Sequence, residues 1–257
     1  MFQLGLKLGS INTQYTKEIL EYYEKGIFKY IELFIPIGSY DNTIEYWKQF
    51  NIPFGIHAPH TLAGLNLASA EDRISNKAKI EETIRFADTL NANYIIFHSG
   101  TNGKIDEVIH QLFNYSDKRF IIENKPIKGF GGDYICVGTD YDELKTITES
   151  LKCGFCLDFG HAICAANTLK KNPIEFIKEL KKLNPLVYHL TDGDYLSEID
   201  SHYHYGAGSF PLKELLSFVP DGGMITNEAK RNDMSTLQEF YQDSIALNEY
   251  TKSRNYK

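Results

Sequence analysis

The sequence predicts an α/β fold, a closed (β/α)8 TIM barrel in which residues 1–257 form a single domain. Three observations support this prediction. The chain is long enough for one large domain with a full core. Short apolar runs alternate with longer segments of helical spacing, which is typical of a parallel sheet. No linker interrupts the alternation, and its eight units match the size of a closed barrel.

The predicted strands are short apolar runs, as expected of strands that are buried in a parallel sheet. In chain order they are Leu4–Ser10, Tyr30–Ile35, Phe54–Pro59, Tyr94–Ser99, Phe120–Asn124, Phe155–Phe159, Leu186–Leu190 and Met224–Asn227.

The predicted helices have apolar residues three and four positions apart, most clearly in Asp72–Leu90. Thr16 is a candidate N-cap for the first helix, and Pro173 suits a first helical turn. In chain order the helices are Lys17–Lys25, Thr43–Phe50, Asp72–Leu90, Ile105–Phe113, Asp142–Ser150, Pro173–Lys182, Leu212–Phe218 and Ser235–Asn248.

A doubly wound open sheet is the alternative fold. The turn after the first strand lacks the G-x-G-x-x-G fingerprint of dinucleotide-binding sheets, and the chain has no G-x-x-x-x-G-K-[ST] phosphate loop. These absences favour the closed barrel.

The composition predicts a folded protein without a general attraction to polyanions. Apolar residues make up 42% and charged residues 24% of the chain, unlike a disordered sequence. The formal net charge of -7 provides no global basic field, which counts weakly against nucleic acid as a partner.

The compartment is predicted to be cytoplasmic. We find no signal peptide and no apolar run of membrane-spanning length, so no membrane partner is expected. Cys153 and Cys156 have C-x-x-C spacing, but no second such pair completes a zinc site. We therefore expect Cys153 and Cys156 to be ordinary thiols that flank the start of a strand, in a reducing compartment.

Residues that bind metals well gather at the carboxyl ends of the predicted strands. Seven of the eight histidines fall there, and His110, within a predicted helix, is expected to be a surface or core-edge residue. In a barrel these strand ends converge on one mouth, where active sites lie. The residues are His57, His60, His98, Glu123, Lys125, Asp158, His161, His189, Asp192, Asp194, Asp200, His202, His204, Glu228 and Lys230.

Such a gathering predicts a metal site. Crowded imidazoles and carboxylates repel one another or lose solvation unless a cation joins them. Mixed His/Asp/Glu ligation suits zinc, manganese or iron. Four of these residues are more readily explained as hydrogen-bonded neighbours of the ligands: His60, Asp192, Asp194 and His204.

The motifs at these strand ends resemble those of the endonuclease IV family of apurinic/apyrimidinic-site endonucleases and of the related xylose-isomerase-like sugar isomerases and epimerases. The resemblance covers nearly the whole chain. The motifs are HAPH (57–60), LNLAS (65–69), FHSG (97–100), IIEN (121–124), CLDFGHA (156–162), YHLTD (188–192), DSHYHYGAG (200–208) and TNEA (226–229).

The resemblance implies a set of nine metal ligands. Both branches share a four-ligand site, whose counterparts are Glu123, Asp158, His189 and Glu228. The endonuclease branch adds two further metals, usually zinc. One is held by counterparts of His57 and His98 with Glu123 as a bridge, and the other by counterparts of His161, Asp200 and His202. The D-x-H motif followed by G-x-G is the most discriminating, and no arginine, common in the isomerases, lies between Leu190 and Leu212.

The implied activity is hydrolysis of a phosphoester with up to three Zn²⁺ ions. Two close cations lower the pKa of a shared water, and the third stabilises charge on the leaving oxygen. The alternative is a sugar or sugar-phosphate isomerase or epimerase with a single Mn²⁺ or Mg²⁺. There Glu123 and Glu228 would be ligands and acid/base groups, and Lys125 or Lys230 would bind a phosphate or polarise an oxygen. A non-enzymatic metal-binding barrel is a third interpretation.

The expected partner is a phosphorylated small molecule or DNA with a phosphodiester. Compared with the endonucleases, the loop after His57 carries a longer insert, and this insert has no tyrosine. Residues 36–42 contain no arginine or lysine. Basic residues near the mouth are few, namely Lys125, Lys128, Lys230 and Arg231. DNA binding draws on several phosphate contacts, whereas a small phosphoester needs one or two.

Overall fold

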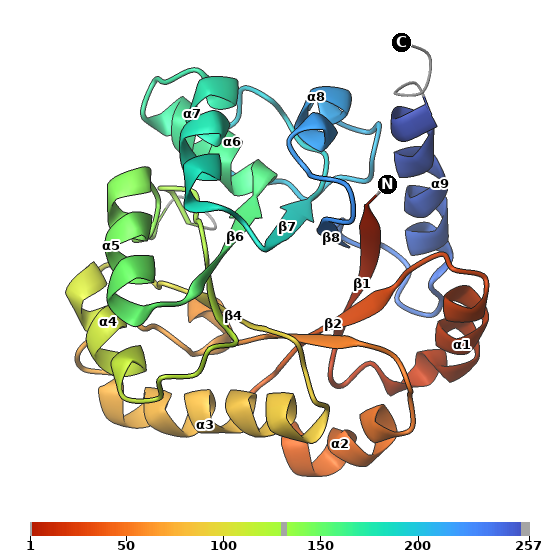
Figure 1. The fold of residues 1–257 in the computed structure, drawn as a ribbon, viewed down its shortest axis with the longest axis horizontal. Helices are drawn as coiled ribbons and strands as arrows, with labels where there is room; N and C mark the ends of the chain where they lie inside the picture. Colours follow the sequence, from red (N-terminus) through yellow and green to blue (C-terminus); the bar gives the residue numbers. More distant parts are fainter. Residues whose placement is uncertain (1, 130–132, 253–257) are drawn as a thin grey trace.

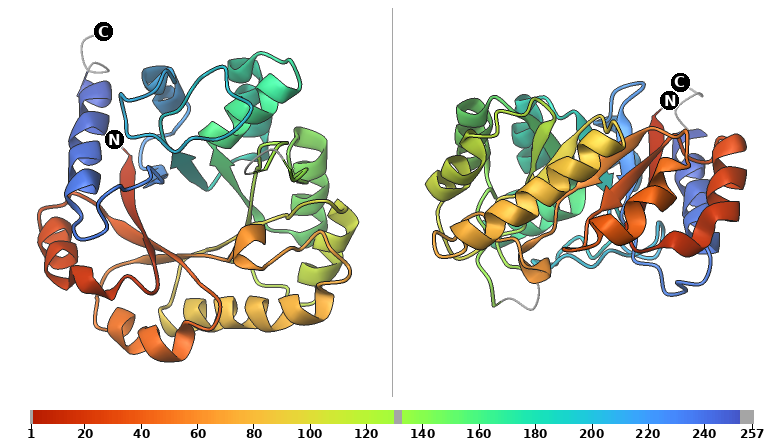
Figure 2. Two further views of the ribbon diagram at one scale, coloured as in Figure 1. Left: turned by 180° about the vertical axis from the view of Figure 1, so that it is seen from behind. Right: turned by 90° about the horizontal axis from the view of Figure 1, so that it is seen from below.

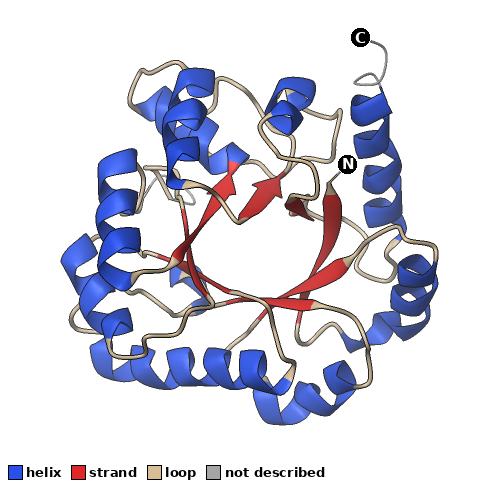
Figure 3. Cartoon of the chain, in the orientation of Figure 1, coloured by secondary structure: helices blue, strands red, loops and turns tan. Residues whose placement is uncertain are grey.

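The chain forms a closed barrel of eight parallel strands, as predicted (Figures 1 and 3). The computed structural model describes residues 2–129 and 133–252. Each strand pairs with the next along the sequence, and the last pairs with the first. The strands are β1 (Gln3–Gly9), β2 (Tyr30–Phe34), β3 (Phe54–His57), β4 (Ile95–His98), β5 (Phe120–Glu123), β6 (Gly154–Asp158), β7 (Val187–Leu190) and β8 (Met224–Asn227).

Helices surround the strands on the outside of the barrel (Figures 1 and 2). They are α1 (Thr16–Glu24), α2 (Tyr40–Lys48), α3 (Arg73–Thr89), α4 (Ile105–Phe113), α5 (Tyr141–Leu151), α6 (Phe159–Thr168), α7 (Pro173–Leu180), α8 (Leu212–Ser217) and α9 (Gln238–Lys252). Short 3₁₀ turns occupy Thr13–Tyr15, Thr61–Ala63 and Lys181–Leu183.

The structure differs from the predicted elements at α6, at the start of α1, at α2 and at the last helix. The helix predicted as Thr43–Phe50 is Tyr40–Lys48. The α6 helix was not predicted, because its residues Phe159–Ala166 are buried at every position and show no polar face. Thr16 as N-cap was wrong: Tyr15 precedes the helix without a side-chain cap, and Thr16 instead donates a hydrogen bond to the Tyr46 hydroxyl at 3.0 Å. The last helix begins at Gln238 rather than Ser235.

Large side chains fill the barrel interior below its mouth. Tyr30, Tyr94, Ile96 and Cys156 belong to a buried cluster separate from the main core between strands and helices. Gly55 makes room for this plug, since a Cβ there would overlap the Tyr94 ring.

Neither a bilayer-spanning helix nor a disulfide is found in the described part of the chain. No described helix combines sufficient length with sufficient apolar character to cross a membrane. Cys136, Cys153, Cys156 and Cys164 are free thiols. Burial raises the pKa of the Cys153 and Cys156 thiols, which disfavours the thiolate that a redox pair needs.

Candidate metal centre

Strand register brings the candidate ligands to one end of the barrel. His57, His98, Glu123 and Asp158 are the last residues of four successive strands, and His189 is the next-to-last residue of β7. His98 lies opposite Glu123 across β4 and β5, and Asp158 lies opposite His189 across β6 and β7. The first turn of α6 adds His161, and the loops after β7 and β8 add Asp200, His202 and Glu228 to the same mouth. All nine predicted ligands are therefore neighbours.

The wholly buried Glu123 carboxylate lies at the centre of this group. Its Oε2 is 3.1 Å from His98 Nε2, 3.2 Å from His57 Nε2 and 3.3 Å from His189 Nδ1. Its Oε1 is 2.9 Å from His161 Nδ1. Burial alone would raise the pKa of Glu123, but nearby imidazoles, His98 foremost, hold it well below its usual range. A carboxylate in this position can bridge two cations.

Asp158 and Glu228 approach His189 from either side. His189 Nδ1 lies 2.8 Å from Glu228 Oε1 and 4.0 Å from Asp158 Oδ2. Burial is the main cause that raises the pKa of Asp158 to about 6. Burial also opposes the charge on Glu228, but His189 and Lys7 hold the pKa of Glu228 well below its usual range. With Glu123, these are the residues that the resemblance predicted to share one metal ion.

A third group adjoins the first two. Asp200 Oδ2 is 2.7 Å from His202 Nε2 and 3.5 Å from His161 Nε2. Although burial disfavours its charge, the His202 ring lowers the pKa of Asp200 to about 2. Burial likewise disfavours a charged His202, yet Asp200 raises the pKa of His202 to about 9. This is the D-x-H pair that the sequence singled out.

Several of these rings have one nitrogen held from outside, which aims the other at the centre. Nδ1 donates to a main-chain carbonyl in three of them: His57 to Ala58 at 2.8 Å, His161 to Asn124 at 2.9 Å, and His202 to Glu228 at 3.0 Å. This leaves Nε2 of His57 and His202 to face the cluster. In His161, Nε2 faces Asp200, while Nδ1 also lies 2.9 Å from Glu123 Oε1.

The donor set fits metal ions. Four buried atoms of the cluster form no hydrogen bond of proper geometry with any described residue: His98 Nε2, Glu123 Oε1, His189 Nδ1 and Asp200 Oδ2. Buried polar atoms without partners are costly, and a cation would satisfy all four. Ligand atoms of His57, His98 and Glu123, and those of His161, Asp200 and His202, lie within 4.8 Å of one another in each set. Imidazole nitrogens with carboxylate oxygens are typical ligands of zinc.

A family model decides the relationship. The chain matches the model described as "Xylose isomerase-like TIM barrel" over residues 24–246. The chain belongs to this family. A curated relative, "Probable endonuclease 4" from Thermoplasma volcanium, is 28% identical over 169 residues, which cover 60% of this chain and 58% of the relative. The chain thus spans less than two thirds of that relative's length.

Solved structures of both branches of the family share the fold. A D-tagatose 3-epimerase-like protein superposes with a TM-score of 0.72 at 20% identity, covering 97% of this chain and 98% of that one. Endonuclease IV from Thermus thermophilus gives a TM-score of 0.71 at 17% identity, covering 98% and 99%. Identities this low establish the fold alone.

The CLDFGHA segment can now be explained by its contacts. Asp158 ends β6, and its Oδ1 accepts a hydrogen bond from the His161 main-chain N–H at 2.7 Å, which caps α6. Asn124 pairs with the main chain of Asp158 through hydrogen bonds of 2.8 and 2.9 Å. Gly160 fits beneath the ligands, since a Cβ there would lie 3.0 Å from Asp200 Oδ1.

Asp192 shapes the long loop that carries Asp200 and His202. Its carboxylate accepts hydrogen bonds of 2.8 to 3.1 Å from the main-chain N–H groups of Gly193, Gly206, Gly208 and Phe210. His202 itself adopts a left-handed φ of 52°, which costs a non-glycine residue about 1–2 kcal/mol. The loop is thus held in one conformation that serves the third group.

The residues predicted to be neighbours of the ligands lie outside the three groups. His60 stacks on Phe34, with 5.5 Å between ring centroids. Asp194 accepts a turn hydrogen bond of 3.0 Å from the Leu196 main-chain N–H. His204 Nδ1 donates to Asp243 Oδ2 on α9 at 2.9 Å. His110 is exposed on α4.

The two candidate lysines differ in position. Lys125 Nζ lies 3.2 Å from His161 Nε2 and 3.8 Å from Glu123 Oε1, so its ammonium reaches the centre. Lys230 is exposed, and its main-chain N–H donates to the His202 carbonyl at 2.9 Å. Only Lys125 of this pair brings its charge among the ligands.

Sequence reasoning missed Lys7 and Glu32. They lie opposite each other on β1 and β2, inside the barrel, with Lys7 Nζ 3.3 Å from Glu32 Oε1. Lys7 also forms an ion pair with Glu228. The available signal was a charge within each of two strands otherwise expected to be buried, which parallel strands rarely carry.

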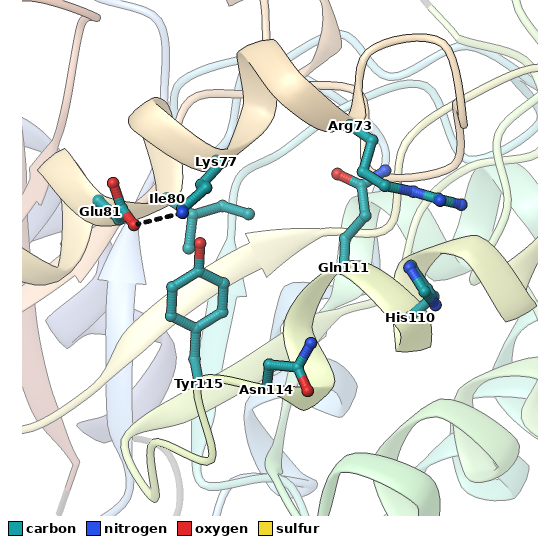
Figure 4. Close-up of a pocket in the computed structure, with 8 residues that line it drawn as sticks. All are labelled: Arg73, Lys77, Ile80, Glu81, His110, Gln111, Asn114 and Tyr115. Carbon is teal, nitrogen blue, oxygen red and sulfur yellow. Dashed lines mark ion pairs between the residues drawn. The ribbon is translucent and has the colours of Figure 1, made fainter.

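A separate surface groove of about 310 Å³ lies between α3 and α4. Figure 4 shows Arg73 and Lys77 on one wall and His110 and Tyr115 on the other, with Lys77 paired to Glu81. The groove lies on the outer wall of the barrel, away from the mouth, and none of the candidate ligands lines it.

Proposed function

We propose that this chain is a metal-dependent hydrolase of phosphoesters whose centre takes up to three zinc ions. The observation that carries the proposal is the His161–Asp200–His202 group beside the Glu123 site. An isomerase with one ion needs only the four-ligand site and leaves this group without a role. A hydrolase that must stabilise both the attacking and the leaving oxygen uses all three groups.

The chain's own residues prepare the pocket for an anionic substrate. When bound, zinc supplies Lewis acidity and lowers the pKa of a coordinated water. Glu123 would hold metal ions through its carboxylate, because Oε2 faces His98 and Oε1 faces His161. The Lys125 ammonium, whose side chain is 13% exposed, can donate to a phosphate oxygen that enters the mouth. The buried walls exclude bulk water and strengthen these interactions.

Two observations bear on whether the phosphoester substrate is DNA or a small molecule. Similarity to an endonuclease 4 relative supports DNA. The basic residues support a small substrate: Lys128 is paired with Glu198, and the Arg231 guanidinium lies 5.2 Å from the centroid of the Tyr15 ring. Few cations remain for a DNA backbone, which requires several contacts. A small phosphodiester is the first substrate to assay and abasic duplex DNA the second.

A sugar isomerase or epimerase with a single ion is the second candidate. It is favoured by the two carboxylates Glu123 and Glu228 on either side of His189, both held ionised by their surroundings. Either carboxylate could take a proton from the carbon next to a carbonyl and return the same proton to the neighbouring carbon, as an isomerase requires. In this function His202 would matter little.

Metal content and turnover separate the candidates. We expect close to three zinc ions per chain by elemental analysis after zinc reconstitution, together with hydrolysis of bis-p-nitrophenyl phosphate or abasic duplex DNA. His202→Ala should lower that hydrolysis by about 100-fold or more, since it removes a group that stabilises transition-state charge. His110→Ala, a matched change on the outer wall, should have no effect.

The contrary outcome is equally concrete. A chain that retains one manganese or magnesium ion, epimerises a keto sugar and leaves every phosphoester intact would be an isomerase. In that case His202→Ala would spare most of the activity.

A further inference from the structure

His189 is oriented differently from the other rings described above. Its outer nitrogen, Nε2, donates to the carboxylate Oε2 of Glu32 at 3.0 Å, whereas His57, His161 and His202 donate to main-chain carbonyls. Its Nδ1 faces Glu123 and Glu228. A carboxylate behind a ligand histidine fixes the ring and raises its basicity.

Glu32 is itself held rigidly. Its side chain is wholly buried, and the same Oε2 also accepts hydrogen bonds from the Tyr94 hydroxyl at 2.8 Å and the Thr226 hydroxyl at 2.9 Å. Thr226 is further linked to the Tyr30 hydroxyl at 2.9 Å. Three donors on one oxygen leave the carboxylate little freedom to turn.

Lys7 keeps Glu32 from acting as a ligand. Atoms of Glu32, His57, His189 and Glu228 lie within 4.8 Å of one another, close enough to hold a cation directly. Lys7 Nζ lies 3.3 Å from Glu32 Oε1 and is paired with Glu228. The ammonium thus lies between the two carboxylates and neutralises part of their charge, so a metal ion is directed to the Nδ1 side of His189.

We propose that Glu32 is the positioning residue of the metal centre: it holds the Nε2–H of His189 so that Nδ1 points to the ion, and Lys7 keeps the Glu32 carboxylate out of the coordination sphere. This inference rests on the metal-dependent function proposed above. It assigns roles to two strand residues, on β1 and β2, that lie outside the nine candidate ligands.

Metal binding without turnover tests the proposal. The purified protein, stripped by a chelator, is titrated with zinc by calorimetry, and the ring nitrogens of the cadmium-loaded protein are followed by heteronuclear NMR. Glu32→Asp keeps the charge beside Lys7 but withdraws the oxygens from His189. We expect it to weaken the tightest binding step by about 10–100-fold, with unchanged saturating stoichiometry and a weakened coupling between cadmium and His189 Nδ1.

A second variant guards against a folding defect. Glu32→Gln keeps the shape of the side chain and removes its charge, and we expect it to weaken zinc binding as Glu32→Asp does. Far-ultraviolet circular dichroism of each metal-free variant verifies the fold. Glu45→Gln, on an exposed helix position of the same chain, is the control and should bind zinc like the wild type.

Three results would overturn the proposal. Unchanged affinity in Glu32→Asp would reduce Glu32 to charge balance for Lys7. A loss of one ion per chain at saturation would make Glu32 a ligand. An unaltered His189 signal, whatever the affinity, would remove the link between the two residues. None of these readouts uses a phosphoester. A failure of the role proposed for Glu32 can therefore be distinguished from a failure of the proposed phosphoester hydrolysis.

Discussion

At the scale of single residues, Asp158 shows why a buried strand ends in a polar side chain. One carboxylate oxygen caps α6 through the His161 N–H, and the other faces His189. The main chain of the same residue is fixed by the Asn124 amide. Strand end, helix start and candidate ligand thus coincide at one position, which explains the three-residue spacing of Asp158 and His161.

His202 gives the site a pH dependence. The metal-free ring has a pKa of about 9 against an ordinary 6.5, so it carries a proton at neutral pH that a zinc ion must displace. We expect zinc affinity at this group to rise about tenfold per pH unit between pH 7 and 9 and then to level off. Calorimetry in buffers of different ionisation enthalpy would detect the released proton.

The pH dependence of folding stability is opposite to the pH dependence of zinc affinity. A histidine with a raised pKa stabilises the folded state fully below pH 6.5, and this contribution is lost as the pH rises through about 9. The metal-free protein should therefore become easier to unfold by urea across this range. If the zinc affinity of His202→Ala rose with pH at the same slope as that of the wild type, the proton displaced by zinc would not come from His202.

At the scale of elements, α6 is the part that sequence reasoning could not find. Helices are recognised by a polar face, and Phe159–Ala166 has none because both sides are covered. The cap Asp158 was visible in the sequence, but it was interpreted as a ligand at a strand end. Asp158 can be both a helix cap and a candidate ligand. Because α6 packs against α7 and β7, it needs no polar face, and its sequence lacks the amphipathic pattern by which a helix is recognised.

Gly160 in α6 provides an element-scale test. Alanine is a better helix former than glycine, and Gly160 is the second residue of α6. Here the alanine Cβ would lie 3.0 Å from Asp200 Oδ1 and 3.4 Å from Asp158 Oδ1, tighter than ordinary contact. We expect Gly160→Ala to leave the thermal unfolding temperature of the metal-free protein unchanged or higher while weakening zinc binding by the His161–Asp200–His202 group.

The comparison variant is Ala166→Gly in the same helix, which should lower the unfolding temperature and leave zinc binding intact. If Gly160→Ala bound zinc as tightly as the wild type, the close packing of α6 beneath the ligands would have no functional consequence.

At the scale of the whole molecule, the sequence was sufficient for the barrel and for the placement of its nine candidate ligands. Strand alternation is a local pattern, and the carboxyl ends of parallel strands share one mouth, so both could be predicted. The contacts of Lys7 and Glu32 could not, because they depend on ring closure. Lys7 meets Glu228 through the pairing of β1 with β8, which brings residues 221 positions apart together.

The whole-molecule arrangement also explains why ligands from distant segments converge. The plug of Tyr30 and Tyr94 closes the barrel below, and Glu32 joins the plug to the centre through Tyr94 and His189. Metal ions held there would join the carboxyl ends of β3 to β7 with the segments that follow β6, β7 and β8.

Anomalous scattering from crystals of the zinc-reconstituted protein tests the central claim most directly, because it counts and identifies the ions together. We expect three zinc peaks: one among His57, His98 and Glu123, one beside Nδ1 of His189, and one among His161, Asp200 and His202. A single peak at the four-ligand site, or peaks that avoid Glu123, would contradict it.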